Sequence, residues 1–113
     1  MEAKAFRYLG LAARAGCVPS GEFQTENAVR NGKAYAVIIA GDASENTKKK
    51  FRNMCEYRNV PVFEFSDKET LGQRIGRGER SSCAITDENL AGAFIKTMRD
   101  EVKGDKNGKK QGS

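Results

Sequence analysis

The sequence contains no histidine, and its three cysteines are spread widely over the chain. Without histidine, neither a Ser-His-Asp nor a Cys-His catalytic arrangement can form, and the commonest nitrogen ligand of transition metals is missing. Cys17, Cys55 and Cys83 include no C-x-x-C pair and lie in or beside apolar stretches, so we expect reduced core thiols and no zinc site. The sequence therefore predicts no enzymatic activity, no metal and no cofactor.

Long apolar segments are missing as well. No apolar run approaches the ~20 residues that a membrane-spanning helix needs. Residues 1–16 lack the continuous apolar segment of a signal peptide. We expect a cytoplasmic protein that makes no membrane contact.

Positive charge is in modest excess. The 20 lysines and arginines outnumber the 15 aspartates and glutamates, which gives a formal net charge of +5. Such an excess favours a polyanionic partner, although a solvated charged surface also explains it. Residues 99–113 have Val102 as their only aliphatic side chain and bury too little surface to offset the entropy of ordering. We expect one domain over 1–98, and a frayed helix end with a disordered basic tail over 99–113.

Hydrophobic periodicity and capping signals predict helices that alternate with short strands. The expected helices cover 2–15, 20–31, 44–58, 66–75 and a last segment through Met98. Ser66 should begin the fourth of them in a capping box with Glu69. The expected strands cover 35–40, 60–65 and 82–86, and residues 17–19 are an edge strand at most because Pro19 donates no hydrogen bond. This alternation predicts a three-layer α/β/α sandwich.

Two glycine-rich segments are similar to nucleotide-binding loops but depart from them. Residues 76–81 begin like G-x-G-x-x-G, yet they end in serine and follow a predicted helix, the reverse of the dinucleotide-binding context. Residues 41–48 begin like a P-loop but have Asn46-Thr47 where Gly-Lys is needed. Asp42 has no evident partner carboxylate, so we expect it to cap the helix over 44–58. Neither segment predicts a nucleotide site.

Three polar segments should meet at one end of the sandwich: 20–24, 41–44 and 77–81. The first offers free backbone N–H groups at a helix start, and the third has two arginines that can pair with phosphates or stack on an unpaired base. Ordinary solvated turns explain the same segments. The basic run Lys48-Lys49-Lys50 with Arg52 predicts a solvent-facing helix side with a supporting electrostatic role.

A series of short motifs, in order over positions 5–97, resembles a known family. The chain resembles the kink-turn RNA-binding ribosomal proteins, the large-subunit families seven-Ae and thirty-e, and particularly their bacterial YlxQ-like branch. The motifs are Leu9-Gly10-Leu11-Ala12, Ser20-Gly21-Glu22, the run from Ala36 to Lys49, Cys55-Glu56, Val60-Pro61-Val62, Leu71-Gly72 with Ile75-Gly76, and Ala84-Ile85-Thr86-Asp87.

The resemblance implies a four-stranded mixed sheet and a mode of RNA binding. In this family the start of the second helix meets tandem sheared G·A pairs of a kinked RNA, and the loop before the last strand covers a flipped-out nucleotide. The corresponding segments here are 21–27 and 77–81. The family pattern Gly-x-Asn-Glu-x-x-Lys falls on Gly21, Phe23, Gln24 and Asn27, so Gln24 can bond a base edge, whereas Phe23 cannot and Asn27 carries no charge.

The expected function is non-catalytic binding of structured RNA, either a kink-turn or ribosomal RNA, by a monomeric bacterial protein that forms a ribonucleoprotein and contacts the ribosome. The alternative is a protein-interaction module on the same fold that has lost RNA readout, as the apolar Phe23 suggests. The basic residues Lys33, Arg77 and Arg80 should hold phosphate. The predicted RNA-binding residues are Gly21, Glu22, Phe23, Gln24, Asn27, Lys33, Arg77, Gly78, Arg80 and Ser81.

Overall fold

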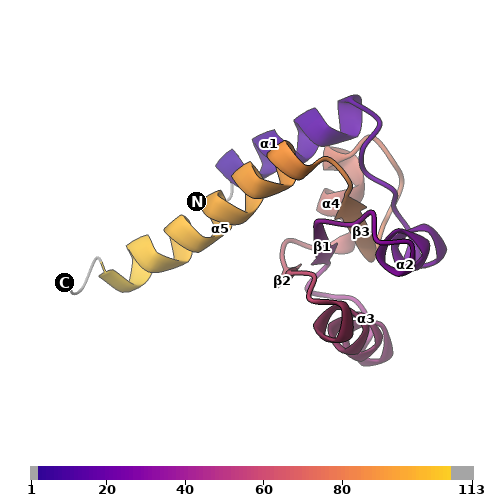
Figure 1. Cartoon of the computed structure of the whole chain (residues 1–113). Coiled ribbons are helices and arrows are strands. Elements are labelled where there is room, and N and C mark those ends of the chain that lie inside the picture. The colour runs from indigo at the N-terminus through magenta and orange to yellow at the C-terminus, as the bar shows by residue number, and fades with distance from the viewer. Residues whose placement is uncertain (1–2, 108–113) are drawn as a thin grey trace.

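The computed structural model describes residues 3–107, with side chains placed over residues 4–100. Within that range the chain forms five helices and three strands (Figure 1). In chain order they are α1 (Ala3–Arg14), α2 (Glu22–Arg30), β1 (Ala36–Ile39), α3 (Glu45–Arg58), β2 (Val62–Glu64), α4 (Lys68–Arg74), β3 (Ser82–Ile85) and α5 (Glu88–Asn107).

The sheet is mixed and has the strand order β2-β1-β3. The central strand β1 runs parallel to β2, with Val37 opposite Val62, and antiparallel to β3, with Val37 opposite Ala84. Every residue of β1 and of β3 is buried. The continuous apolar run over 35–40 therefore forms a strand that is covered on both faces, as its sequence predicts.

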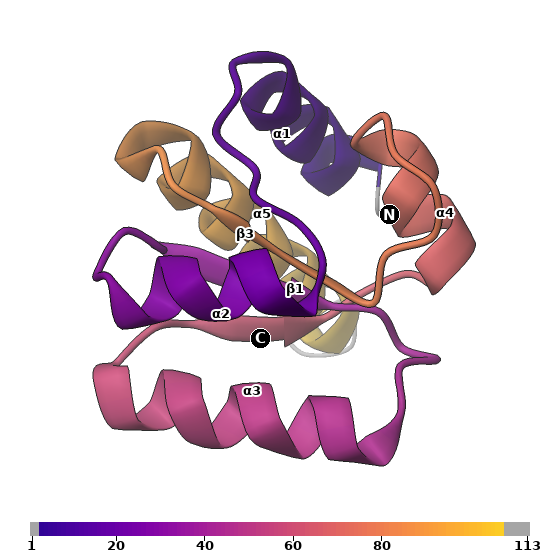
Figure 2. The ribbon, with the colours of Figure 1, turned by 90° about the vertical axis from the view of Figure 1, so that its right-hand side faces the viewer.

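Helices cover both faces of the sheet, so the molecule has three layers (Figure 2). On one face, Ile38 and Ile85 belong to a core cluster with apolar residues of α1, α4 and α5, among them Leu9 and Phe94. On the other face, Val37, Ile39 and Ala84 pack with residues of α2 and α3. Successive side chains of a strand point to opposite faces, which is why adjacent residues of β1 belong to different clusters. The predicted α/β/α layering is confirmed.

The predicted four-stranded sheet is wrong in its strand count, because the described residues form three strands. The segment before α2 runs antiparallel to β3: the N–H of Ala84 donates to the carbonyl of Pro19 at 3.0 Å, and that of Thr86 donates to Cys17 at 2.9 Å. It qualifies only as an isolated bridge between Ser20 and Cys83. Pro19 has no N–H to return to the ladder, which limits the pairing.

The C-terminal helix α5 continues past Met98 to Asn107, into the segment over 99–113 for which the sequence predicts a frayed helix end followed by a disordered basic tail. An ion pair between Lys96 and Asp100, four residues apart at 3.2 Å, supports the helix across the predicted boundary. Residues 99–107 therefore belong to the helix, and the disordered tail stays a prediction. The remainder, 108–113, lies outside the described residues.

One helix start differs by a residue from its prediction. The cap of α4 is Asp67, whose side chain accepts a hydrogen bond from the N–H of Thr70 at 2.7 Å. Ser66 precedes the cap in a left-handed conformation, with φ 69°. The same hydrogen bond from Thr70 lowers the pKa of Asp67. The predicted capping box of Ser66 with Glu69 is therefore wrong: the cap lies one residue later, at Asp67, and the residue three positions after it is Thr70.

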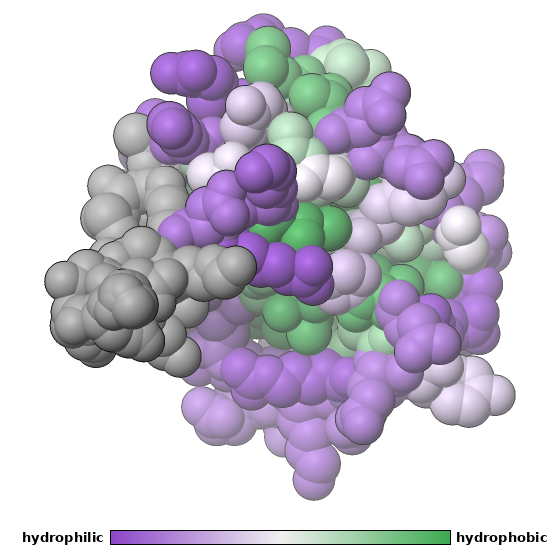
Figure 3. Space-filling view, turned by 60° about the vertical axis from the view of Figure 1, so that its left-hand side comes forward, coloured by the Kyte–Doolittle hydropathy of each residue, from purple (hydrophilic) through white to green (hydrophobic). Residues whose placement is uncertain are grey.

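The face of the molecule drawn in Figure 3 is mostly hydrophilic, with an apolar area between bands of hydrophilic residues. A hollow of about 640 Å³ lies between the edge strand β2 and α5 and includes Phe63, Ile95 and Met98. None of the helices in the described part of the chain is both long and apolar enough to span a membrane.

Candidate nucleic-acid interface

The three polar segments predicted to meet do lie at one end of the sheet, at the right-hand side of Figure 2. The N–H of Gly21 donates to the carbonyl of Ser82 at 2.9 Å, which ties the start of α2 to the start of β3. The N–H of Ala40 donates to the carbonyl of Ser81 at 2.9 Å, which brings the end of β1 to the same place. The starts of α2 and α3 and the loop before β3 therefore border one surface.

The start of α2 depends on the backbone conformation of Gly21. Gly21 is the N-terminal cap residue, with φ 89° and ψ 160°, a combination that is essentially restricted to glycine. No side chain caps the helix there. Because the first N–H groups of a helix have no intrahelical partner, this turn presents backbone donors with a positive dipole end, which suits a phosphate or an acceptor on a base edge.

The loop before β3 is fixed beside this helix start through Arg80. The Arg80 Nε donates to Ser20 Oγ at 2.9 Å, and one terminal nitrogen donates to the carbonyl of Glu79 at 2.9 Å. The backbone N–H of Arg80 donates to Lys68 of α4 at 3.1 Å. Ser20 and Arg80 are 60 residues apart in sequence. Their hydrogen bond joins the two predicted segments into one surface and holds the guanidinium in place.

The tip of the same loop rests on α4. The N–H of Arg77 donates to the carbonyl of Gly72 at 2.7 Å, and a Cβ added at Gly72 would overlap the carbonyl oxygen of Gly78. Glycine at this helical position therefore permits the close approach of the loop. Arg77 and Gly78 are exposed. The loop presents a solvent-facing arginine at Arg77 from an anchored backbone.

One face of α2 is exposed next to this loop. Phe23 is 75% exposed, and Gln24 and Asn27 are also exposed. The opposite face is buried, where Thr25 accepts a hydrogen bond from the hydroxyl of Ser82 at 3.3 Å. The spacing of three and four residues places Phe23, Gln24 and Asn27 on one side of the helix. These side chains, with Gly21 before them, form a strip that faces solvent.

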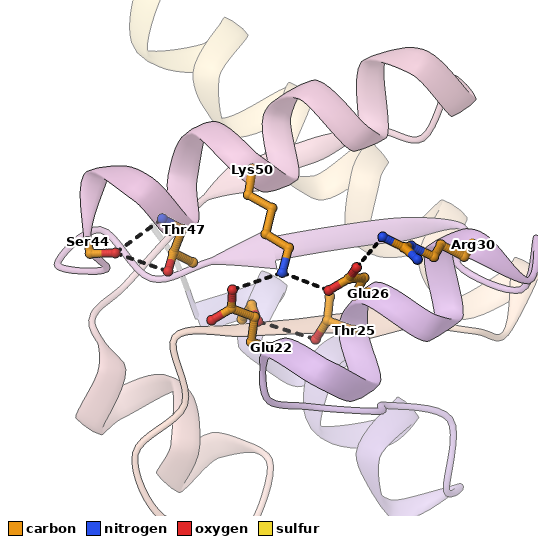
Figure 4. A network of polar contacts seen from close by, with 8 residues as sticks. Glu22, Thr25, Glu26, Arg30, Ser44, Thr47 and Lys50 are labelled. Atoms are coloured by element: carbon orange, nitrogen blue, oxygen red, sulfur yellow. Dashed lines mark hydrogen bonds and ion pairs between the residues drawn. The ribbon is translucent and has the colours of Figure 1, made fainter.

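Acidic residues of α2 are held by a lysine of α3 (Figure 4). The Lys50 ammonium lies 3.0 Å from Glu22 and 2.7 Å from Glu26, and Arg30 pairs with Glu26 at 2.5 Å. The hydrogen bond from Lys50 lowers the pKa of Glu26, and the two carboxylates raise the pKa of Lys50. Glu22, one of the predicted site residues, therefore takes part in joining α2 to α3.

Two other cations of the basic run on α3 are also paired with carboxylates. Lys48 lies 3.7 Å from both Glu45 and Glu64, and Arg52 pairs with Glu64. The sequence predicts a solvent-facing basic run, and the exposed Lys49 fits that prediction. Its neighbours are largely neutralised by acidic residues that lie elsewhere in the sequence.

Asp42 caps a different helix from the one predicted. Its carboxylate accepts from the N–H of Lys68, at the start of α4, at 2.9 Å. The start of α3 is capped by Ser44, which accepts from the N–H of Thr47 at 3.1 Å (Figure 4). The N–H of Gly41 donates to Ser66 at 2.8 Å, so the loop after β1 lies against the loop before α4. Asp42 thus has a structural partner 26 residues away.

Lys33 does not belong to this surface. It follows α2 at the helix's other end, where its N–H donates to the carbonyl of Ala28 at 2.9 Å. The nine residues of α2 span about 14 Å at 1.5 Å per residue. The predicted site residues that the structure brings to one end are therefore Gly21, Glu22, Phe23, Gln24, Arg77, Gly78, Arg80 and Ser81, with Asn27 one turn along α2.

Within the described residues, no group of three or more cysteine, aspartate or glutamate side chains is arranged to hold a metal ion. One contributor to the surface is absent from the predicted site residues: Ser20, whose hydroxyl positions Arg80. Ser20 stands next to Gly21 in the sequence, but no sequence pattern indicates that its hydroxyl contacts Arg80, a residue of a distant loop.

Comparison with known proteins places the chain in a family. Residues 3–94 match the model of the ribosomal protein L7Ae/L30e/S12e/Gadd45 family. The chain is 39% identical over 93 residues to the RNA-binding protein YlxQ of Bacillus subtilis (82% of this chain, 93% of the relative). It is 43% identical over 88 residues to the protein of the same name from Enterococcus faecium (78% and 84%).

Solved structures share the fold. A Bacillus halodurans protein of unknown function superposes with a TM-score of 0.80 at 37% identity and covers 83% of this chain and 95% of its own. A 15.5 kD RNA-binding protein of Giardia lamblia superposes with a TM-score of 0.75 at 21% identity and covers 91% and 88%, a likeness of fold alone. From the family match over most of the chain and the two relatives near 40% identity, this protein belongs to the ribosomal protein L7Ae/L30e/S12e/Gadd45 family.

Proposed function

We propose that this protein binds structured RNA without catalysis, through the start of α2 and the loop before β3. The observation that carries the proposal is the hydrogen bond of Arg80 to Ser20, which joins these two segments into one fixed surface. Both YlxQ relatives are named as RNA-binding proteins, and the family includes ribosomal proteins. The protein acts as a monomer in the bacterial cytoplasm, in ribonucleoprotein complexes that include the ribosome.

The residues of the surface have distinct roles in this proposal. The backbone N–H groups after Gly21 meet a phosphate or a base edge, and Gln24 donates to and accepts from a base edge. Phe23, which is 75% exposed, stacks on an unpaired base. Arg77 pairs with phosphate, since its side chain faces solvent. Glu22 positions α2 through Lys50 and contributes less to the RNA contact.

A kink-turn is the RNA that this arrangement fits best. The start of α2 would meet the tandem G·A pairs, while the loop over 77–81 would cover a flipped-out nucleotide, in the arrangement that the family resemblance implies. Gln24 supplies hydrogen bonds to a base edge, and the adjacent Phe23 supplies an aromatic face. The combination favours a site where a stacked unpaired base lies next to the pairs.

Fluorescence anisotropy with two RNAs tests this function. One is a kink-turn duplex, and the other is the same duplex with its G·A pairs replaced by Watson–Crick pairs. We expect tighter binding to the kink-turn, with an affinity that falls steeply with salt because several cation–phosphate contacts release counterions. Equal affinity for the two RNAs would refute the kink-turn specificity, and the absence of salt-dependent binding to either would refute RNA binding.

The exposure of Phe23 also favours a second candidate, a protein-interaction module on the same fold. In that case a pull-down from lysate should recover a protein partner after nuclease treatment. Replacing Arg77 and Arg80 together with alanine should then leave any weak RNA binding unchanged. The RNA-binding proposal expects the double variant to lose affinity for the kink-turn and the partner to be released by nuclease.

A further inference from the structure

A second hollow lies at the C-terminal ends of α2 and α3, opposite the candidate interface. These two helix ends are at the left-hand side of Figure 2. Its volume is about 690 Å³. It is bordered by the last turns of the two helices and by the segments that lead into β1 and β2. We call it the tyrosine hollow, after two of its lining residues, Tyr35 and Tyr57.

The two tyrosines leave aromatic surface in contact with water. Tyr57 is 83% exposed and Tyr35 is 42% exposed, so the described fold uses neither ring fully as core. Arg58 lies beside Tyr57, with its guanidinium carbon 5.9 Å from the ring centroid. The same guanidinium donates to the carbonyl of Arg30 at the end of α2 at 3.0 Å, which fixes the arginine between the two helices. An aromatic face therefore stands next to a positioned cation.

The electrostatics of the tyrosine hollow favour a nucleobase over a phosphate. Two helices end there, and the C-terminal end of a helix carries partial negative charge. The carbonyls of Arg30 and Cys55 at these ends already accept hydrogen bonds from Arg58 and Val60. Pro61, four residues after Tyr57, has no N–H to offer the carbonyl of that residue. None of the lining residues is acidic, so a polyanionic strand meets no carboxylate from the lining. Such a site accepts the amino groups of a base while its ring stacks on tyrosine.

A lysine that forms no ion pair within the described residues lies at the rim of the tyrosine hollow. Lys33 stands between Gly32 and Ala34, which both line the hollow, and it is exposed. A lysine at this rim can meet the phosphate that accompanies a base in the hollow. The sequence predicts that Lys33 holds phosphate. Because Lys33 lies at this end of α2, such a phosphate contact would be separate from the candidate interface.

We propose that the tyrosine hollow binds an unpaired nucleobase of the RNA, stacked on Tyr57, with Lys33 on the adjoining phosphate. This inference rests on the proposed RNA-binding function and extends it by a second contact. The two sites are separated by the length of α2, about 14 Å at 1.5 Å per residue over nine residues. A single-stranded extension of a structured RNA that runs along α2 reaches both.

An extension on the RNA tests this site. The kink-turn duplex is compared with the same duplex bearing a single-stranded adenosine extension, placed in turn on each of its ends. Wild type should bind one of the extended RNAs at least about fivefold more tightly than the blunt one, the lower limit for one base stacked on an aromatic side chain. Tyr57→Ala should abolish the gain, and Tyr57→Phe, which keeps the aromatic face, should retain it.

Because Tyr57 is largely exposed, its replacement leaves the core intact. Equal affinity of wild type for blunt and extended RNAs, or a gain that persists in Tyr57→Ala, would overturn the inference. An NMR titration with oligoadenylate alone separates it from the proposed function. Shifts of the Gly32 and Asn59 amides without binding to the kink-turn would overturn the proposed function only, and unshifted amides would overturn the tyrosine hollow.

Discussion

The backbone conformation of Gly21 predicts how much stability the protein loses when this residue of the candidate interface is replaced. Its φ of 89° and ψ of 160° belong to a region of backbone space that costs other residues about 1–3 kcal/mol. Nothing lies within 4 Å of the Cβ that alanine would add, so backbone strain is the whole penalty. We expect Gly21→Ala to lower the free energy of unfolding by about 1–3 kcal/mol. If the backbone instead relaxes, the hydrogen bond from Gly21 to Ser82 is lost and the start of α2 moves.

Urea denaturation followed by circular dichroism measures this cost, and RNA affinity measured on the same variant reports the displaced helix start. Gly92→Ala is the matched control, because Gly92 is exposed within α5, has no positive φ and has nothing within 4 Å of an added Cβ. Alanine there should raise stability by about 0.5–1 kcal/mol. A stability of Gly21→Ala within about 0.5 kcal/mol of wild type would refute the strain argument, since surface changes without a special feature lie in that range.

Two further predictions follow from titrating groups. Lys50 lowers the pKa of Glu26 chiefly by a hydrogen bond. A carboxyl group whose pKa is lower in the folded state stabilises the fold at pH values above its unfolded-state pKa, and this stabilisation is lost as the pH falls through its folded-state pKa. Lys50→Met should therefore weaken the decline in melting temperature on acidification below about pH 4.5, and an unchanged decline would contradict the pairing. Burial raises the pKa of Cys55 to about 11 and of Cys83 to about 12. At about pH 8, Ellman's reagent should react readily only with the half-buried Cys17 in the native protein and with all three thiols in denaturant, whereas fast native reaction of a second thiol would argue against this burial.

The order of helices and strands could be predicted from sequence because each element carries a local signal. The apolar run over 35–40 predicts a strand covered on both faces, and β1 is that strand. The expected strand over 82–86 corresponds to β3, and Ser44 caps the helix that it was expected to begin. Local patterns also predicted a helix start at Ser20 or Gly21 and a flexible loop with two arginines over 77–81. These features depend on a few adjacent residues, so periodicity and capping chemistry reveal them.

The rest depends on contacts between residues that are distant in sequence. Arg80 meets Ser20, and Asp42 meets the backbone of Lys68; no local pattern specifies either pair. Lys50 was assigned to a solvent face because nothing near it in the sequence showed that two glutamates of α2 lie opposite. No local pattern marks the exact end of the last helix beyond Met98. The absence of aliphatic residues argued for a frayed end and a disordered tail, whereas charged side chains four residues apart also stabilise a helix.

The salt dependence of kink-turn binding by Arg77→Gln tests directly whether the loop before β3 binds RNA. Arg77 is exposed on the loop before β3, and its backbone N–H donates to the carbonyl of Gly72. The substitution therefore removes a side-chain charge and leaves the fold intact. We expect Arg77→Gln to bind the kink-turn more weakly, with a slope of log affinity against log salt that is smaller by about 1. Replacing the exposed Lys49 on α3 with glutamine is the control and should leave both values unchanged. An affinity and slope equal to those of wild type would contradict the claim that this loop binds RNA.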